Sequence, residues 1–383
     1  MDYADADWTN HGGDLNNRRY AVEKCFQLVN SQELSIKMVI LCWQGHNSNS
    51  AVANGVVYFH HGMDICMRDI RTAVVIALAR ATGRLVWSTT LDPRPRVLIT
   101  GSGTVYMGAF YVGVSSLEEG LPPEQCCTFR GSVVKLAIRT GAILWQTYML
   151  PDNGGRLGGY AGAAVWGSSP AIDTSRRLVY VATGNSTQLL LKCRLWRSPM
   201  LLTITSNGTF RDVAVALQKS GFAWALDRDN GAGWTGGKEG GGIWGAATDG
   251  RRIYTNIANS DRQSFMRTPS NQTTTAGAWV ALDANTGDVL WARQTQQRHC
   301  PGACYTGQRH LFVGSVASDG PIYAIDTNTG NLGGKVSPYL DSRNFTLCIL
   351  CSLSLAKPAT MKEAITSTGT KKGELLLADV TLS

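Results

Sequence analysis

The stretch from Trp279 to Thr295, WVALDANTGDVLWARQT, is the feature that most constrains the fold of this 383-residue chain. Apolar residues alternate with others on both sides of the short loop ANTG, which is typical of a β-hairpin. Gly287 can adopt a positive φ without a Cβ clash. Asp283 is expected to accept hydrogen bonds from the amides of the loop. The stretch therefore predicts two paired strands with Trp291 on the second one.

The same hairpin recurs along the chain. The segments 77–87 (ALARATGRLVW) and 135–145 (KLAIRTGAILW) keep the Thr-Gly turn and the tryptophan, whereas 225–234 and 324–334 are altered copies. A second turn followed by an aromatic-rich strand precedes several copies. Repeats of about 40–50 residues with four strands each are typical of propeller blades. The alternative is a β-sandwich whose turns are similar by chance.

We therefore predict an all-β protein, a β-propeller of four-stranded blades with about six recognisable blades. A tryptophan in each hairpin would fill the wedge between neighbouring sheets, with its N–H bonded to a carbonyl group. We expect Trp87, Trp145 and Trp291 to be buried between sheets. Substantial helix is not expected within 75–335.

Composition limits the other classes of protein. The chain is 44% hydrophobic with 42 glycines, and no stretch reaches 18 uninterrupted apolar residues, so we expect no transmembrane segment. The net charge of +8 is spread along the chain without a basic run, and we expect no nucleic-acid partner. The polar, acidic N-terminus does not read as a secretory signal peptide.

Ten cysteines favour an oxidising compartment. Four glycosylation sequons point the same way, at Asn185, Asn207, Asn271 and Asn344. The spacings CPGAC and CILC lack a histidine or second pair at zinc-site distance, and we interpret both as structural or incidental.

A resemblance emerges from the N-terminal segment 8–20, WTNHGGDLNNRRY, together with the repeat A-x-D-x-x-T-G-x-x-x-W. Both resemble motifs of the pyrroloquinoline quinone (PQQ) dependent alcohol dehydrogenases, in particular the plant and bacterial polyvinyl alcohol dehydrogenase-like branch. The second is that family's tryptophan-docking motif. The resemblance implies one β-propeller domain over 8–340, incomplete relative to an eight-bladed parent, and a non-repeat tail over 341–383. The segments 21–73, 186–200 and 335–383 depart from the family pattern.

The resemblance also implies a PQQ site. Cys126 and Cys127 match a vicinal disulfide that packs over the quinone, and Arg130 matches an arginine that contacts it, although the spacing is shorter than in the methanol dehydrogenase branch. Trp166 matches the tryptophan under the quinone. The competing interpretations are two reduced core cysteines and another tryptophan between blades.

Three further positions complete the implied site. Asn185, in the motif Thr-Gly-Asn, matches the asparagine that ligates calcium, but it also suits a turn or a glycan. Lys219 matches a cation beside the quinone oxygens, or is a solvated turn residue. Trp244 is expected to face the central axis. Calcium prefers six to eight oxygen ligands with carboxylate charge, so one asparagine predicts weak calcium binding.

The residue that would act as general base is not identified. No acidic residue lies between Asn185 and Asp212, and Asp212 opens a strand. Asp173 and Asp227 are the nearest substitutes, but both are expected to hold turns. Two hypotheses follow. One is a quinoprotein-like oxidoreductase with a small or polymeric alcohol as substrate and weak or no activity. The other is a catalytically silent propeller that binds a ligand or protein. The resemblance and sequons imply secretion, and the sequence does not indicate the oligomeric state.

Overall fold

The computed structural model describes a chain built from β-strands and turns. The described residues are 14–19, 38–40, 51–54, 56–61, 73–79, 82–118, 121–122, 124–157, 160–166, 169–184, 199–217, 223–230, 233–236, 246–257, 259, 262–295, 301–306, 309–315, 322–336, 348–349 and 377–379. They contain no α-helix, and so none of them belongs to a helix that could span a bilayer. The all-β class is therefore confirmed.

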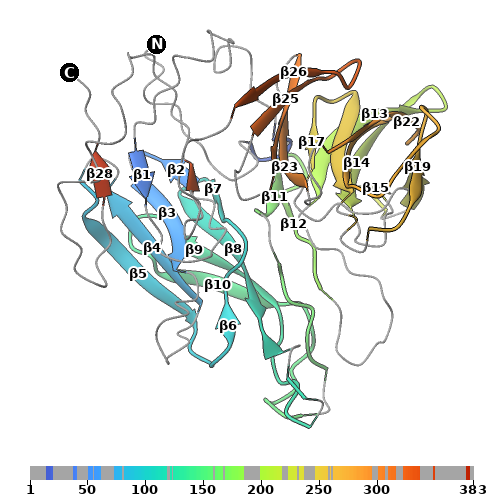
Figure 1. Cartoon of the computed structure of the whole chain (residues 1–383). Coiled ribbons are helices and arrows are strands. Elements are labelled where there is room, and N and C mark those ends of the chain that lie inside the picture. Colours follow the sequence, from blue (N-terminus) through green and yellow to red (C-terminus); the bar gives the residue numbers. More distant parts are fainter. Residues whose placement is uncertain are drawn as a thin grey trace.

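Most strands form antiparallel sheets in which sequential strands lie side by side (Figure 1). This meander is the strand order of propeller blades. The first such sheet consists of β2 (Ala51–Ala53), β3 (Val56–His61), β4 (Ala73–Ala79) and β5 (Leu85–Asp92). The second consists of β7 (Thr104–Tyr106), β8 (Ala109–Ser116), β9 (Ser132–Ala137) and β10 (Ile143–Tyr148), with β6 (Val97–Leu98) paired to the end of β8.

The two-stranded sheet β11 (Ala171–Asp173) and β12 (Leu178–Tyr180) follows. Three more four-stranded sheets complete the series. The first of them consists of β13 (Met200–Ser206), β14 (Thr209–Leu217), β15 (Ala223–Asp227) and β16 (Gly233–Gly236). The second consists of β17 (Ala247–Thr248), β18 (Arg252–Ile257), β21 (Ala278–Asp283) and β22 (Val289–Gln294). The third consists of β23 (Pro301–Thr306), β24 (His310–Ser315), β25 (Ile322–Asp326) and β26 (Leu332–Val336).

Two elements lie outside this series. The hairpin β19 (Phe265–Arg267) and β20 (Gln272–Thr274) is inserted between β18 and β21. A three-stranded sheet pairs β1 (Met38–Ile40) with β27 (Cys348–Ile349) and β28 (Leu377–Asp379). Segments 21–73 and 335–383 were predicted to depart from the family pattern. Short strands from both segments pair in this one small sheet.

The repeated hairpin has the predicted turn chemistry. The Asp283 carboxylate accepts hydrogen bonds from the amides of Asn285 and Thr286 at 2.8 and 3.1 Å. Gly287 has a φ of 80° and its amide donates to the Asp283 carbonyl at 2.9 Å. Local residue chemistry therefore determines this turn.

Two tryptophans join neighbouring sheets as predicted. Nε1 of Trp87 donates to the Ile138 carbonyl at 2.9 Å, and Nε1 of Trp291 donates to the Thr327 carbonyl at 3.0 Å. Each indole packs on the turn glycine of the next hairpin, Gly141 or Gly330, so closely that a Cβ there would lie less than 3 Å from the ring. Each contact between neighbouring sheets thus depends on both the turn glycine and the indole ring.

The prediction for Trp145 is wrong. Its side chain is 38% exposed, and it contacts Tyr111 edge-on rather than entering a buried wedge. The next sheet in the chain, β11–β12, contributes only two strands to the described structure. Among the described residues after β12, no turn between third and fourth strands corresponds to those that receive Trp87 and Trp291.

The N-terminal segment 14–19 connects four sheets. Backbone carbonyls of Leu15, Asn16, Arg18 and Arg19 accept hydrogen bonds of 2.7 to 2.9 Å from amides in β11, β13, β17 and β23, namely those of Ile172, Leu201, Thr248 and Thr306. These are the first strands of four successive sheets. One short segment therefore holds their inner strands together.

Candidate functional site

The paired cysteines lie at the end of a short turn. The amides of Gln125 and Cys126 both donate to the carbonyl of Pro122, at 2.9 and 3.0 Å. The structure pairs Sγ of Cys126 with Sγ of Cys127 across a cis peptide. Cys127 is buried, whereas Cys126 is partly exposed.

A buried carboxylate fixes the residues that follow this pair. Glu118 is 9% exposed and accepts hydrogen bonds from the amides of Thr128 and Phe129 at 2.6 and 3.0 Å. Its other oxygen accepts from the Thr128 hydroxyl at 3.2 Å. Charge-assisted bonds of this kind are stronger than neutral ones. The sequence analysis missed Glu118, because its partners lie ten and eleven residues further along a loop.

The next residues pair with the second segment of the predicted site. Arg130 and Gly162 form a parallel bridge, with the Gly162 amide donating to Phe129 at 2.7 Å and the Gly131 amide donating to Gly162 at 2.8 Å. A Cβ on Gly131 would collide with the carbonyl of Ala163, so only glycine fits this approach. The cysteine segment and the Trp166 segment therefore lie side by side.

Trp166 is held in place by its chain neighbours and by Gly184. The indole is 8% exposed, and the preceding Val165 amide donates to Val114 at 3.1 Å. The Gly184 amide donates to Ala164 at 2.7 Å, and a Cβ on Gly184 would lie 3.1 Å from Cδ1 and Nε1 of the indole. The two motifs that carry the resemblance, the tryptophan and Thr-Gly-Asn, are thus in direct contact. Three predicted site residues, Asn185, Lys219 and Trp244, lie outside the described part of the chain.

Arg130 is directed to a neighbouring loop. Its guanidinium pairs with Asp152 at 3.0 Å, donates to the Leu150 carbonyl at 3.3 Å, and lies 4.2 Å from the ring centroid of Tyr148. Both terminal nitrogens of the guanidinium therefore contact this loop. Contact with a quinone remains a prediction for this residue.

The three acidic residues considered as a general base all have structural partners. Asp227 accepts from the amides of Asp229 and Asn230 in its own turn. Asp173 and Asp212 share Arg176 and Arg228, at N–O distances of 2.8 to 3.1 Å. This ion-pair network, which the sequence analysis did not foresee, joins the β11–β12 turn to β14 and β15.

The network makes these carboxylates poor proton acceptors. Burial raises the pKa of Asp173, but hydrogen bonds from Ser175 and Arg176 and the charge of Arg228 outweigh it and lower the pKa to about 2. The hydrogen bond from Thr203 lowers the pKa of Asp212; burial opposes this, but the hydrogen bond from Arg176 and the charges of Arg228 and Arg176 lower the pKa further. A general base works best with a pKa near the operating pH. Neither carboxylate meets that condition.

Metal-binding residues do not cluster in the described ranges. No group of three or more His, Cys, Asp or Glu side chains there is arranged to hold a metal ion. Glu118, the buried carboxylate that fixes the residues after the cysteine pair, has both oxygens bonded to protein groups.

Comparison with known proteins adds independent information. Residues 42–233 match a family described as outer membrane protein assembly factor BamB. A polyvinylalcohol dehydrogenase of Sphingopyxis sp. (strain 113P3) is 29% identical over 338 residues, which cover 68% of this chain and 50% of the relative. A polyvinylalcohol dehydrogenase of Pseudomonas sp. is 31% identical over 252 residues, which cover 49% of this chain and 39% of the relative. The chain thus spans half or less of the length of these curated relatives.

Solved structures with the same fold include quinohemoprotein alcohol dehydrogenase ADHIIG of Pseudomonas putida HK5. It has a TM-score of 0.61 and 15% identity, with 86% of this chain and 72% of that one covered. A europium-containing methanol dehydrogenase has a TM-score of 0.59 and 16% identity, with 87% and 85% covered. Identities this low support the fold alone, and these neighbours are β-propellers. The propeller class predicted from the repeats is confirmed.

Proposed function

Because the chain belongs to the PQQ-dependent alcohol dehydrogenase-like family, we propose that it is a quinoprotein-like oxidoreductase that binds PQQ and acts on an alcohol, with weak or no turnover. The observation that carries this proposal is the packing of Gly184 on the indole of Trp166, beside the segment with the cysteine pair. We assign the propeller domain to 8–340 and the non-repeat tail to 341–383.

We propose that these segments hold a flat aromatic ligand. Trp166 would form the floor, and Cys126 and Cys127, oxidised to a vicinal disulfide, would form the opposite wall. Glu118 and the Arg130–Gly162 bridge hold these two segments in register. Lys219 and Trp244 would complete the site, with Lys219 stabilising negative charge on the ligand. When bound, PQQ would supply the acceptor for the two electrons removed from the alcohol.

We infer weak turnover because none of the three candidate carboxylates in the described ranges is suited to act as the base. The alcohol must lose a proton as it is oxidised, and a positioned base typically contributes about 10² to 10⁴-fold to the rate. Asp173 and Asp212 are tied to arginines, and Asp227 holds its turn. Asn185 alone supplies one neutral oxygen to calcium, so calcium would bind weakly even with the quinone present.

A silent propeller is the second candidate. The ion-paired state of the acidic residues favours it, because a quinone site without a base would bind the ligand and not turn over. For both candidate functions we propose a location outside the cytoplasm, on the basis of the family resemblance and the sequons. Asn207 and Asn271, two of those sequons, both lie in turns.

Titration with PQQ in the presence of calcium tests the proposal. We expect quenching of tryptophan fluorescence and saturable binding, which Trp166→Phe should weaken about fivefold, since stacking on the larger ring contributes ~1 kcal/mol. The matched control is Trp145→Phe, because Trp145 is 38% exposed and lies on strand β10 rather than in the Trp166 segment. Failure of the parent protein to bind PQQ would contradict the proposal.

A dye-reduction assay then separates the two candidates. The PQQ-loaded protein is given ethanol or polyvinyl alcohol with an artificial electron acceptor. Slow reduction supports the oxidoreductase, and binding without reduction supports the silent propeller. Fast turnover would show that a base has been overlooked, and the activity of Asp212→Asn would then show whether Asp212 is that base.

A further inference from the structure

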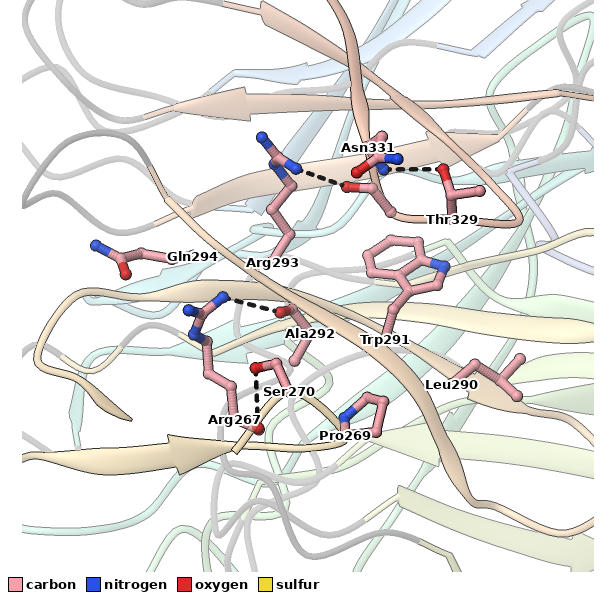
Figure 2. Close-up of a pocket in the computed structure, with 11 residues that line it drawn as sticks. Arg267, Pro269, Ser270, Leu290, Trp291, Ala292, Arg293, Gln294, Thr329 and Asn331 are labelled. Atoms are coloured by element: carbon pink, nitrogen blue, oxygen red, sulfur yellow. Dashed lines mark hydrogen bonds between the residues drawn. The ribbon is translucent and has the colours of Figure 1, made fainter. Parts of the chain in front are cut away.

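A separate pocket lies along the outer edge of strand β22, where the β19–β20 hairpin and the β25–β26 turn approach it (Figure 2). Its volume is about 520 Å³. Strand β22 is the last strand of its sheet, so its backbone has no strand partner on this side. The lining residues are Arg267, Pro269, Ser270, Thr329, Gly330, Asn331 and the strand residues from Leu290 to Gln294. None of the residues in contact with the cysteine pair or Trp166 belongs to this pocket.

Two arginines of this pocket lack a counterion within the described structure. Arg267 and Arg293 form no ion pair there, in contrast to Arg94, Arg176 and Arg228, which all pair with carboxylates. The pocket lining itself contains no Asp or Glu. Two positive charges therefore face one cavity without neutralisation.

Backbone carbonyls hold both guanidinium groups in place. Nη1 of Arg267 donates to Ala292 at 3.2 Å and Nη1 of Arg293 donates to Gly330 at 3.2 Å. Nη2 of Arg267 donates to the Gln272 side chain at 2.6 Å. Nε of Arg267 is buried and has no hydrogen-bond partner among the described residues, which is costly for a charged donor. These bonds preorganise the arginines and leave further donors for a ligand.

The pocket has a polar end and an apolar end. In Figure 2 the two arginines and Gln294 lie on the left, Leu290 and Trp291 lie on the right, and Pro269 lies below the centre; the polar residues Thr329 and Asn331 lie above Trp291. Leu290 is 39% exposed, so it presents apolar surface to an incoming molecule. A simple inorganic anion would use only the polar end.

We propose that this pocket binds a small organic carboxylate, with the carboxylate group at Arg267 and Arg293 and an apolar body against Leu290, Pro269 and the edge of Trp291. The guanidinium fork matches the planar geometry of a carboxylate. The site is distinct from the proposed quinone site and does not require PQQ.

Calorimetric titration of the intact protein with sodium benzoate, at ionic strength held constant with sodium chloride, tests this site. We expect saturable binding that weakens at least tenfold in Arg293→Gln and in Arg267→Gln. Arg84→Gln is the matched control, because it removes one exposed arginine from a distant hairpin and should bind benzoate like the parent. Arg293→Lys keeps the positive charge but loses the planar guanidinium group, so its affinity for benzoate should lie between those of the parent and Arg293→Gln. This variant tests the site if a neutral variant does not fold.

Two further titrations test the two ends of the pocket. Leu290→Ala should weaken benzoate and leave sulfate unchanged, and the parent should bind benzoate more tightly than sulfate. No benzoate binding by the parent, or equal affinity in Arg84→Gln and both neutral pocket variants, would overturn the proposal. Equal or tighter binding of sulfate would overturn the assignment of an apolar body.

Discussion

The indole Nε1 of Trp87 donates a hydrogen bond to the backbone carbonyl of Ile138, 51 residues later in the chain, and this bond is buried. Trp87→Phe removes the donor and leaves a buried carbonyl unpaired. We expect a loss of about 2 kcal/mol in the free energy of unfolding, measured by urea denaturation followed by circular dichroism. Trp145→Phe should cost about 0.5 kcal/mol or less, since Trp145 is 38% exposed. Equal losses in both variants would contradict this account of docking.

The glycine beneath that indole offers a second test. Gly141 has a φ of 72°, and a Cβ at this position would collide with Trp87 and Thr89. Gly141→Ala should destabilise the protein both through the backbone conformation and through the collision with the ring. Gly208→Ala isolates the first effect, because Gly208 has a φ of 74° and open space around it. We expect Gly141→Ala to cost about 1 to 3 kcal/mol more than Gly208→Ala in thermal melts.

Glu118 is expected to stabilise the conformation around the cysteine pair. Glu118→Gln exchanges a carboxylate for a weaker acceptor at the amides of Thr128 and Phe129, and should cost about 1 to 3 kcal/mol. It should also accelerate reduction of Cys126 and Cys127 by dithiothreitol, monitored by thiol labelling. Glu124→Gln, on the exposed part of the same loop, is the control. Unchanged reduction kinetics in Glu118→Gln would show that the carboxylate does not control this segment.

Acid stability is expected to depend on Asp173. Its folded pKa, about 2, lies below the ordinary value of 3.8 for an aspartate, so the ionised form stabilises the fold above pH 4 and this contribution is lost as the pH falls toward 2. The contribution is on the order of 2 kcal/mol for this buried carboxylate. Asp173→Asn should be less stable at pH 6 and should lose less stability between pH 4 and pH 2 than the parent. Asp288→Asn, on an exposed turn, should follow the parent curve in both ranges.

Local chemistry explains which parts of the structure were predictable. The Asp283–Gly287 turn depends on residues within one hairpin, and the sequence alone predicted it correctly. Trp87 and Trp145 occupy the same position in equivalent motifs, yet only Trp87 meets a docking turn. The burial of a repeat tryptophan depends on the following sheet, which its own motif does not encode.

Contacts in the candidate site also depend on residues that the sequence motifs do not identify. The family resemblance implied that Trp166 and Asn185 belong to one site, but the contact between Trp166 and Gly184 was not predicted from the sequence. The direction of Arg130 depends on Asp152 and Tyr148, two residues that no motif singled out. The carboxylate pocket unites β19, β22 and the β25–β26 turn, and no sequence spacing predicts that meeting.

The hydrogen bonds of residues 14–19 have a consequence for the order of folding. Leu15 binds Ile172, whereas Arg19 binds Thr306, so this early segment must wait for partners that span most of the chain. Contacts with such long sequence separation form slowly, because the intervening chain must first be ordered. During synthesis, each sheet can form its own hairpins, but the inner strands can be fastened only one after another, and the last of them only when Thr306 has emerged. Until then the set of bonds is incomplete, and this interval is when the protein is most vulnerable to aggregation.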